Sequence, residues 1–201
     1  SVGIFAGGVI AYEAVIPIGS AAVTKDLSAL LRCSPKEAER LKTQEASALS
    51  GRIDPSETVE ILQSGHELHR HLQRRVLSEI VESRMREILS YVATHLQKSG
   101  LHGLLQGGVI LTGGGSALPG LPQLCEEVLP GMKARGGAPS FGGTLTESVD
   151  QPAFAVVAGL ARFMSEGAED EELAAVSGKT SWTVKVTHAL LGKVKGNRSM
   201  I

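Results

Sequence analysis

The chain is poor in aromatic residues, which make up 3% of its 201 positions, although 42% of the residues are hydrophobic. Its core must therefore be built from Ala, Val, Ile and Leu, a composition typical of buried parallel strands flanked by helices. The formal net charge is only −1, so no overall positive field favours nucleic acid as a partner. No apolar run reaches the roughly 18 residues that a membrane-spanning helix needs.

Signals for metal binding and for covalent catalysis are also scarce. Cys33 and Cys125 form no CxxC or Cys/His zinc spacing, and we expect both to be buried thiols. His66, His69 and His71 crowd one segment, but no Cys or carboxylate is spaced to complete a ligand set. A solvated or partner-facing strand is the preferred interpretation of these histidines. No nucleophile, base and orienting group form a recognisable combination, so we assign no catalytic residue.

The apolar pattern predicts an α/β chain with an inserted pair of strands. Two strands are expected at residues 1–5 and 9–18 around a glycine-bearing turn, and a more polar pair at 58–63 and 67–72. A long helix is expected at 74–98, because its apolar residues recur at spacings of three and four.

Shorter helices are predicted from their start signals. Thr24 is expected to cap a helix at 25–32, and Ser34, followed by proline, is expected to cap the next one. A further helix is expected at 119–129. The very apolar, alanine-rich segment 152–164 predicts a helix that is buried.

The most informative segment is VILTGGGSALPGL at residues 109–121. An apolar strand leads directly into three glycines and then into a helix, which allows the backbone to approach a nucleotide closely. An ordinary tight turn between a strand and a helix explains the glycines equally well, because glycine motifs are weak evidence by themselves.

This segment resembles the adenosine motif of the actin, Hsp70 and hexokinase superfamily, and other segments resemble the FtsA family of actin-like bacterial cell-division proteins. The resemblance runs from residue 1 to about residue 164. The further matching segments are VIPIG at 15–19, VTKDL at 23–27, EAERLK at 37–42, RRVLSEIVESR at 74–84, and Arg135, Gly136, Pro139, Pro152, Gly159 and Leu160 at matching spacing.

The resemblance implies the C-terminal half of an actin-like, ribonuclease H-like fold with an inserted small subdomain. Residues 1–24 and 80–164 would form subdomain 2A, and residues 25–79 would form the inserted subdomain 2B. The superfamily's second phosphate loop, Asp-x-Gly-x-Gly-Thr-Thr, would immediately precede Ser1. The sequence departs from the family at Ser20, where a second glycine is frequent.

The resemblance also implies an ATP site, with Mg²⁺ in the full-length protein. The three glycines would lie against the adenosine and the α-phosphate, while Glu39 and Lys42 would reach the ribose and the adenine. From the residues alone, Glu39 and Lys42 are more simply interpreted as a surface ion pair one helical turn apart. The implied cofactor-binding residues are Gly19, Glu39, Lys42, Gly113, Gly114 and Gly115.

The C-terminal segment changes from acidic to basic. Residues 165–179 are expected to form an acidic, flexible linker, and residues 180–201 a basic amphipathic helix lying in the plane of a membrane. A disordered basic tail is the alternative, but FtsA-like proteins end in a linker followed by a membrane-targeting helix. The residues expected to contact anionic lipid are Trp182, Lys185, Val186, Leu190, Lys193 and Lys195.

The resemblance implies an ATP-binding scaffold with at most weak ATPase activity. It would tether FtsZ filaments to the inner face of the cytoplasmic membrane at the division septum and help to assemble the divisome. Subdomain 2B would receive the C-terminal tail of FtsZ, and the protein would polymerise; nucleic acid is not an expected partner. The alternatives are a PilM-like adaptor of type IV pilus assembly, or another ATPase or phosphotransferase of the actin/Hsp70 superfamily.

Overall fold

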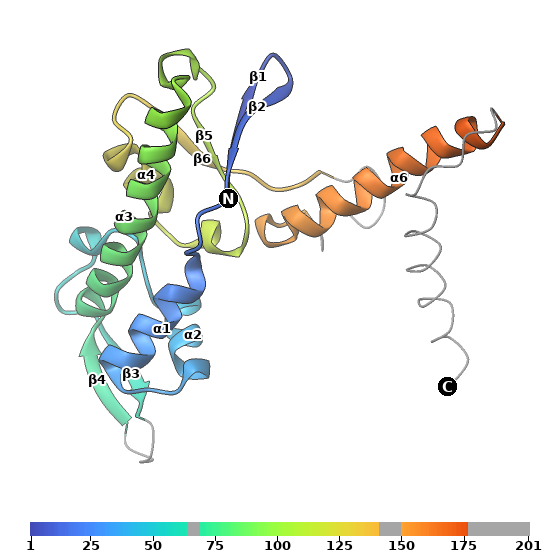
Figure 1. Ribbon diagram of the computed structural model, residues 1–201. Helices are drawn as coiled ribbons and strands as arrows, with labels where there is room; N and C mark the ends of the chain where they lie inside the picture. The colour runs from blue at the N-terminus through green and yellow to red at the C-terminus, as the bar shows by residue number, and fades with distance from the viewer. Residues whose placement is uncertain (64–68, 141–149, 177–201) are drawn as a thin grey trace, which may run out of the picture. The chain divides into compact units, whose positions relative to one another are not determined.

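The computed structural model describes residues 1–63, 69–140 and 150–176, with side chains up to Ser165. The chain divides into two compact units, Ser1–Ala138 and Pro139–Ile201, and each is considered by itself. The elements, labelled in Figure 1, are β1 (Val2–Ala6), β2 (Val9–Ala14), α1 (Ser20–Leu31), α2 (Pro35–Gln44), η1 (Ser50–Arg52), β3 (Thr58–Leu62), β4 (His69–Gln73), α3 (Arg74–Ser99), η2 (His102–Leu104), β5 (Val109–Leu111), η3 (Gly114–Ala117), α4 (Leu121–Val128), β6 (Ala134–Gly136), η4 (Pro152–Phe154) and α6 (Ala155–Val176).

The described strands form three separate two-stranded sheets. Both predicted antiparallel pairs are present, as β1 with β2 and as β3 with β4. Parallel strands contribute little to the core of the described residues. The parallel pairing is that of β5 with β6, three residues long each, and Ile110 in the middle of β5 is 55% exposed. The buried apolar residues lie mainly on helices instead.

The long helix α3 provides the largest part of this core, and it confirms the predicted apolar face. It packs against α1 and α4, and its buried side chains meet those of Val23, Leu27 and Leu31 on α1. Ser78 is a fully buried polar residue of α3, and its hydroxyl accepts a hydrogen bond from the Ser47 backbone N–H at 3.0 Å. The buried residues of α3 are Leu77, Ser78, Val81, Met85, Leu89 and Leu96.

The helix boundaries confirm most of the start and stop signals and correct one. The Ser34 hydroxyl accepts the Glu37 N–H at 3.2 Å, as expected for an N-cap, and Gly100 ends α3 with a φ of 68°. Thr24, however, does not cap α1. That helix begins at Ser20 with Gly19 as its N-cap, so Thr24 lies inside the first turns and its side chain is free to contact α2.

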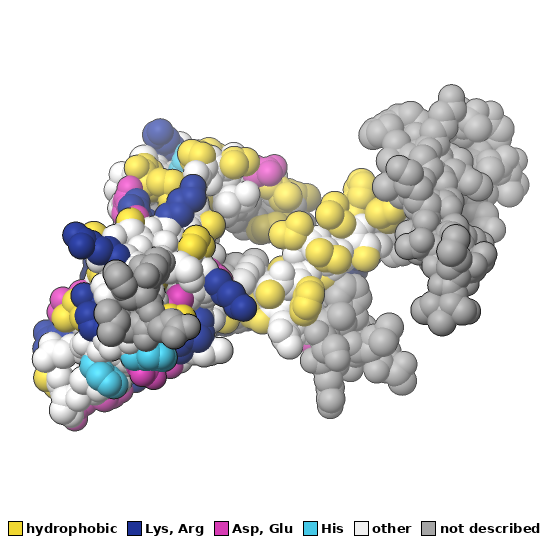
Figure 2. Space-filling view, turned by 90° about the horizontal axis from the view of Figure 1, so that it is seen from below, with side chains coloured by type: hydrophobic (Ala, Val, Ile, Leu, Met, Phe, Trp, Pro, Cys, Tyr) yellow, Lys and Arg dark blue, Asp and Glu magenta, His cyan; other side chains and the backbone are white. Residues whose placement is uncertain are grey.

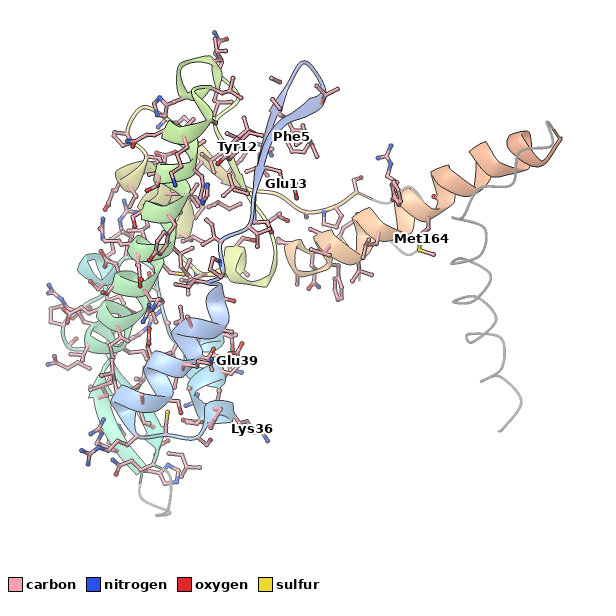
Figure 3. All side chains as sticks on the ribbon, in the orientation of Figure 1. Phe5, Tyr12, Glu13, Lys36, Glu39 and Met164 are labelled. Atoms are coloured by element: carbon pink, nitrogen blue, oxygen red, sulfur yellow. The ribbon has the colours of Figure 1, made fainter. Side chains whose placement is uncertain are left out.

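The hairpin of β1 and β2 has two different faces. Ile4 is buried, and the Tyr12 hydroxyl is hydrogen-bonded to Nδ1 of His95 on α3 at 2.9 Å, so one face is anchored to the long helix. Phe5 lies on the other side of the hairpin, as Figure 3 shows, and is 64% exposed. The alternation of side chains along the strands therefore separates a covered face from an uncovered one.

In the second unit, η4 leads into α6, which packs only on η4 within the described residues of that unit. Val156, Leu160 and Phe163 are 72%, 58% and 70% exposed, Ala158 is buried, and Figure 2 shows hydrophobic side chains gathered along the helix. The burial of the whole segment stays a prediction, because this unit is described by itself. The helix also continues to Val176, beyond the expected end near Met164 and into the predicted linker. Residues 180–201, the predicted membrane helix, lie outside the described residues. None of the described helices is long and apolar enough to span a membrane.

Candidate functional site

The glycine segment forms a closed turn directly after β5, which confirms the predicted strand–glycine–helix arrangement. Gly113 has a φ of 87°, a backbone conformation that favours glycine. The Ser116 N–H and hydroxyl both donate to the Gly113 carbonyl oxygen, at 3.0 and 2.8 Å. The short helix η3 follows, and α4 then begins after Gly120.

The space beside these glycines differs from one to the next. A Cβ atom added to Gly113 or Gly114 would meet nothing within 4 Å, whereas one added to Gly115 would lie 3.1 Å from Cβ of Ser20. Gly115 thus brings the turn against the first residue of α1. Gly113 and Gly114 border open space, so their backbone can be approached closely by a ligand.

Two helices provide charged and polar side chains facing this turn. Lys42 on α2 donates from Nζ to Oε2 of Glu39 at 2.6 Å and to Oγ1 of Thr24 on α1 at 3.0 Å. The Thr24 hydroxyl donates to the same Glu39 oxygen at 2.6 Å. The Lys42 side chain is only 12% exposed, while that of Glu39 is 52% exposed. The predicted Glu39–Lys42 pair is therefore present. Its third member is Thr24, which the sequence predicts as a helix cap.

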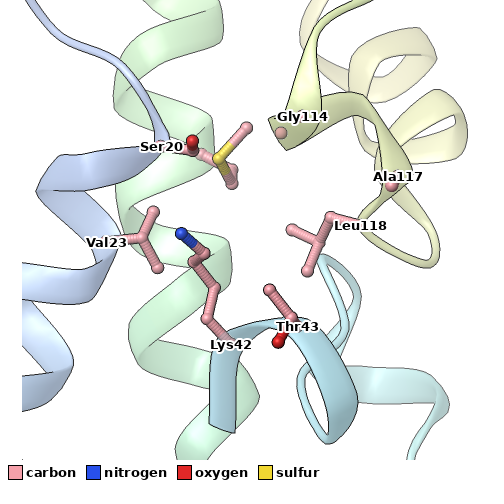
Figure 4. Close-up of a pocket in the computed structure, with 9 residues that line it drawn as sticks. Ser20, Val23, Lys42, Thr43, Gly114, Ala117 and Leu118 are labelled. Atoms are coloured by element: carbon pink, nitrogen blue, oxygen red, sulfur yellow. The ribbon is translucent and has the colours of Figure 1, made fainter. Parts of the chain in front are cut away.

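Lys42 joins two adjoining cavities, one lined by the glycine turn and the other by Glu39. In the first, shown in Figure 4, Lys42 rises from α2 toward α1, and Gly114 and Leu118 lie across from it. The second lies between α1 and α2 and includes Glu39 and Thr24. Ser20 and Lys42 line both. The remaining lining residues are Val23, Thr43, Met85, Gly115 and Ala117 in the first cavity, and Ala21, Lys25, Ser28, Ala29 and Pro35 in the second.

The charges in these cavities are held by hydrogen bonds. The pKa of Glu39 lies below its ordinary value, first because of the hydrogen bond from Lys42 and then because of that from Thr24, which together outweigh its partial burial. The carboxylate is therefore ionised at neutral pH and accepts hydrogen bonds. A fixed ammonium, a carboxylate and an approachable glycine backbone are groups that suit the phosphate, hydroxyl and ring nitrogen atoms of a nucleotide.

The structure brings most of the sequence-predicted site residues together. Gly114, Gly115 and Lys42 line one cavity, Glu39 lines the adjoining one, and Gly113 holds the turn. Gly19 lines neither cavity; it caps α1 and precedes Ser20, which lines both. Thr24, Met85 and Leu118 also line the cavities, although the sequence does not predict them as site residues. Of these, Thr24 carries a sequence signal as part of the VTKDL segment at 23–27, where it is predicted to be a helix cap.

His69, His71 and the two cysteines do not line either cavity, and His66 lies outside the described residues. Nδ1 of His69 lies 2.8 Å from Oε1 of Glu60 on the neighbouring strand, and both side chains are more than half exposed. Within the described ranges, no group of three or more His, Cys, Asp and Glu side chains is arranged to hold a metal ion. Cys33 and Cys125 are buried free thiols as expected, and burial raises the pKa of Cys125 to about 11.

Comparison with solved structures identifies the fold. The crystal structure of MreB 5 of Spiroplasma citri bound to AMPPNP matches 86% of this chain and 51% of that chain, with a TM-score of 0.65 and 14% sequence identity. The ADP-bound structure of the same protein matches with a TM-score of 0.59. The fold and the cavities beside the glycine turn therefore define part of an actin-like lobe.

Comparison with protein families identifies the family to which the chain belongs within this fold class. The profile of the family "Cell division protein FtsA" matches residues 1–159, and the chain belongs to this family. FtsA of Pseudomonas aeruginosa is 34% identical over 179 residues, which cover 89% of this chain and 43% of that protein. FtsA of Bacillus subtilis is 32% identical over 84% of this chain and 37% of that protein. The chain thus spans about two fifths of the length of the curated relatives that it matches.

Proposed function

We propose that this chain forms the part of an actin-like cell-division scaffold that holds the adenosine of ATP. In the full-length protein, Mg²⁺ would accompany the nucleotide. ATP would act as a ligand for conformational change and polymerisation, with at most weak hydrolysis. The scaffold would tether FtsZ filaments to the inner face of the cytoplasmic membrane at the division site.

One observation carries the nucleotide proposal: a single cavity is lined by Gly114 and Gly115 from the glycine turn and by Lys42 from α2. These residues lie more than 70 positions apart in the sequence, and each was implied by the family resemblance. The uncrowded space at Gly114 supports the proposal further, because no other atom of the chain occupies the position that a side chain there would take.

The proposal is tested by titrating the chain with a fluorescent ATP analogue and comparing two glycine substitutions. Gly114→Val places a side chain into the cavity, whereas Gly51→Val places the same side chain on η1. Neither added Cβ meets any atom within 4 Å, and neither glycine has a positive φ, so both variants should melt like the parent chain. We expect Gly114→Val to lower affinity by roughly tenfold or more, as steric overlap with a ligand would, and Gly51→Val to leave it unchanged.

Two results would contradict the nucleotide proposal. The first is an unmodified chain that binds no ATP analogue at millimolar concentration. The second is a folded Gly114→Val variant that binds as tightly as the Gly51→Val control, because the ligand would then occupy another site.

The membrane part of the proposal rests on residues 180–201, which combine Trp182 with several lysines. We propose that this segment binds anionic lipid in the plane of the membrane. Co-sedimentation with vesicles containing phosphatidylserine should be lost in a chain that ends at Gly178. Replacing Lys185, Lys193 and Lys195 by serine should weaken it by about 1 kcal/mol per lysine. Neutral phosphatidylcholine vesicles are the control, and equal sedimentation of the intact and the shortened chain would refute the anchor.

The partner part of the proposal assigns the tail of FtsZ to residues 25–79. Fluorescence anisotropy of a labelled FtsZ C-terminal peptide, with a scrambled peptide as control, measures this interaction directly. Equal binding of both peptides would remove FtsZ as a specific partner of this segment. Membership in the FtsA family favours this partner over the pilus-adaptor and phosphotransferase alternatives that the sequence left open.

A further inference from the structure

Thr24 joins the two groups that the nucleotide proposal needs. Its Oγ1 atom accepts a hydrogen bond from Nζ of Lys42 at 3.0 Å and donates one to Oε2 of Glu39 at 2.6 Å. Lys42 and Glu39 also contact each other through this same carboxylate oxygen, at 2.6 Å. The three side chains thus form a closed triangle that links α1 to α2.

The position of Thr24 within α1 explains why its hydroxyl is available for this role. Because α1 begins at Ser20, Thr24 lies one turn inside the helix and its described hydrogen bonds go to α2. Asp26 lies about 200° further around the same helix. It binds Arg84 on α3 through two hydrogen bonds of 2.6 and 3.0 Å. Thr24 and Asp26 of the VTKDL segment therefore connect α1 to two different helices, α2 and α3.

Lys42 depends on a second partner because of its environment. Its side chain is only 12% exposed, and an ammonium group that is largely removed from water needs hydrogen-bond acceptors from the protein. Glu39 is half exposed, and an ion pair with such a group holds a long lysine side chain only weakly. The Thr24 hydroxyl adds a second acceptor for the Lys42 ammonium. Its position is well defined, because the threonine side chain is short and its χ1 rotation is restricted.

We propose that Thr24 is a positioning residue of the nucleotide site, which holds the Lys42 ammonium and the Glu39 carboxylate at the border of the two cavities. Both contacts to Glu39 use Oε2, so Oε1 can accept a hydrogen bond from a sugar hydroxyl in the cavity between α1 and α2. This inference rests on the proposed function, since it assigns a task within the proposed site.

The test compares Thr24→Val, which replaces the hydroxyl by a methyl group of similar size, with Thr24→Ser, which keeps the hydroxyl. In titrations with the fluorescent ATP analogue, we expect Thr24→Val to weaken binding about threefold to tenfold, as the loss of one or two hydrogen bonds does. Thr24→Ser should bind within about twofold of the parent chain. In a Lys42→Ala background, Thr24→Val should have a smaller effect than in the parent chain, because part of the role of Thr24 is exerted through Lys42 and the rest through Glu39.

Asp26→Asn is the matched control. It weakens the link from α1 to α3 on another side of the same helix and touches neither cavity. If Asp26→Asn weakens nucleotide binding as much as Thr24→Val does, the effect comes from general loosening of α1, and the positioning role is overturned. Failure of serine to restore binding in a folded variant overturns it as well.

A second measurement does not depend on nucleotide. The rate at which acetic anhydride acylates Lys42, relative to the exposed Lys36 on the same helix, can be followed by peptide mass spectrometry. Thr24→Val should raise this ratio several-fold, because the ammonium loses one of its two described hydrogen-bond partners, while Thr24→Ser should not. If the parent chain binds no nucleotide, the proposed function fails. The acylation ratio still decides whether Thr24 positions Lys42, and equal ratios in the parent and Thr24→Val would overturn that role.

Discussion

The long helix α3 and the hairpin of β1 and β2 both carry rows of apolar side chains, yet they place them differently. Leu77 and Val81 of α3 are completely buried, whereas Phe5, Val9 and Ile10 of the hairpin are 64%, 66% and 57% exposed. The helix is surrounded by α1, α4 and η1, while the hairpin has only one covered face. The stability of this unit is therefore expected to come from its helices, and the hairpin offers an apolar surface of the kind used for association.

The largest effect should come from a leucine in the helical core. Leu77→Ala removes a fully buried side chain, and we expect the free energy of unfolding to fall by about 2–5 kcal/mol. Leu30→Ala is the matched control, because this leucine of α1 is 65% exposed and its loss should change stability by no more than about 0.5 kcal/mol. Urea denaturation measures both. Similar losses in the two variants would contradict the assignment of the core to α3.

Two glycine substitutions test whether close backbone packing beside β5 and β6 also contributes to stability. A Cβ atom at Gly108 would lie 2.2 Å from the Lys133 carbonyl oxygen, and its φ is 72°, whereas Gly113 has a φ of 87° with nothing near its Cβ. Gly113→Ala should cost only the conformational strain, about 1–2 kcal/mol. Gly108→Ala should cost more, because the pairing of β5 with β6 must also shift. Equal melting temperatures of the two variants would show that Gly108 does not remain close to the Lys133 carbonyl group.

The next effect concerns an ion pair that supports α3. Glu82 accepts the Ser50 N–H and hydroxyl at 2.8 and 2.7 Å and pairs with Arg86 at 2.7 Å. Burial raises the pKa of Glu82, but these hydrogen bonds together outweigh it, so the pKa lies below its ordinary value. A carboxylate with a lowered folded-state pKa contributes stability above its unfolded pKa, and this contribution is lost as the pH falls through the folded value.

Stability should therefore decrease below the ordinary glutamate range near 4.5. Glu82→Gln should be less stable at pH 7 by about 1–2 kcal/mol and should lose less stability on acidification than the parent chain. Thermal melts between pH 7 and pH 3 measure this. Parallel pH profiles of the two proteins would show that Glu82 does not contribute to the acid sensitivity.

The smallest effect on stability should come from the hairpin's exposed face. Phe5→Ser should change the free energy of unfolding by less than about 0.5 kcal/mol but should reduce self-association, as measured by analytical ultracentrifugation. Ile4→Ser, one residue away and buried, should instead destabilise the fold. Unchanged self-association of Phe5→Ser would mean that this face is not the surface through which copies meet.

Much of the fold was predictable because its signals are local. Ser34 with the following proline, Gly100, and the spacing of apolar residues in α3 act over one or two turns of chain, and the structure confirms each. The glycine turn after β5 was recognised for the same reason. For α6, by contrast, an apolar composition shows what a helix could bury but not which element covers it, so its burial stays a prediction.

The sequence by itself determined the order of the elements, the position of the glycine turn and, through resemblance, the family. Only the tertiary structure decided that Thr24 meets Glu39 and Lys42, fifteen and eighteen positions away, and that Gly115 lies against Ser20. The physical reason is that caps and turns depend on neighbouring backbone groups. A contact between side chains on different helices depends instead on how those helices pack, which in turn is set by the whole buried core.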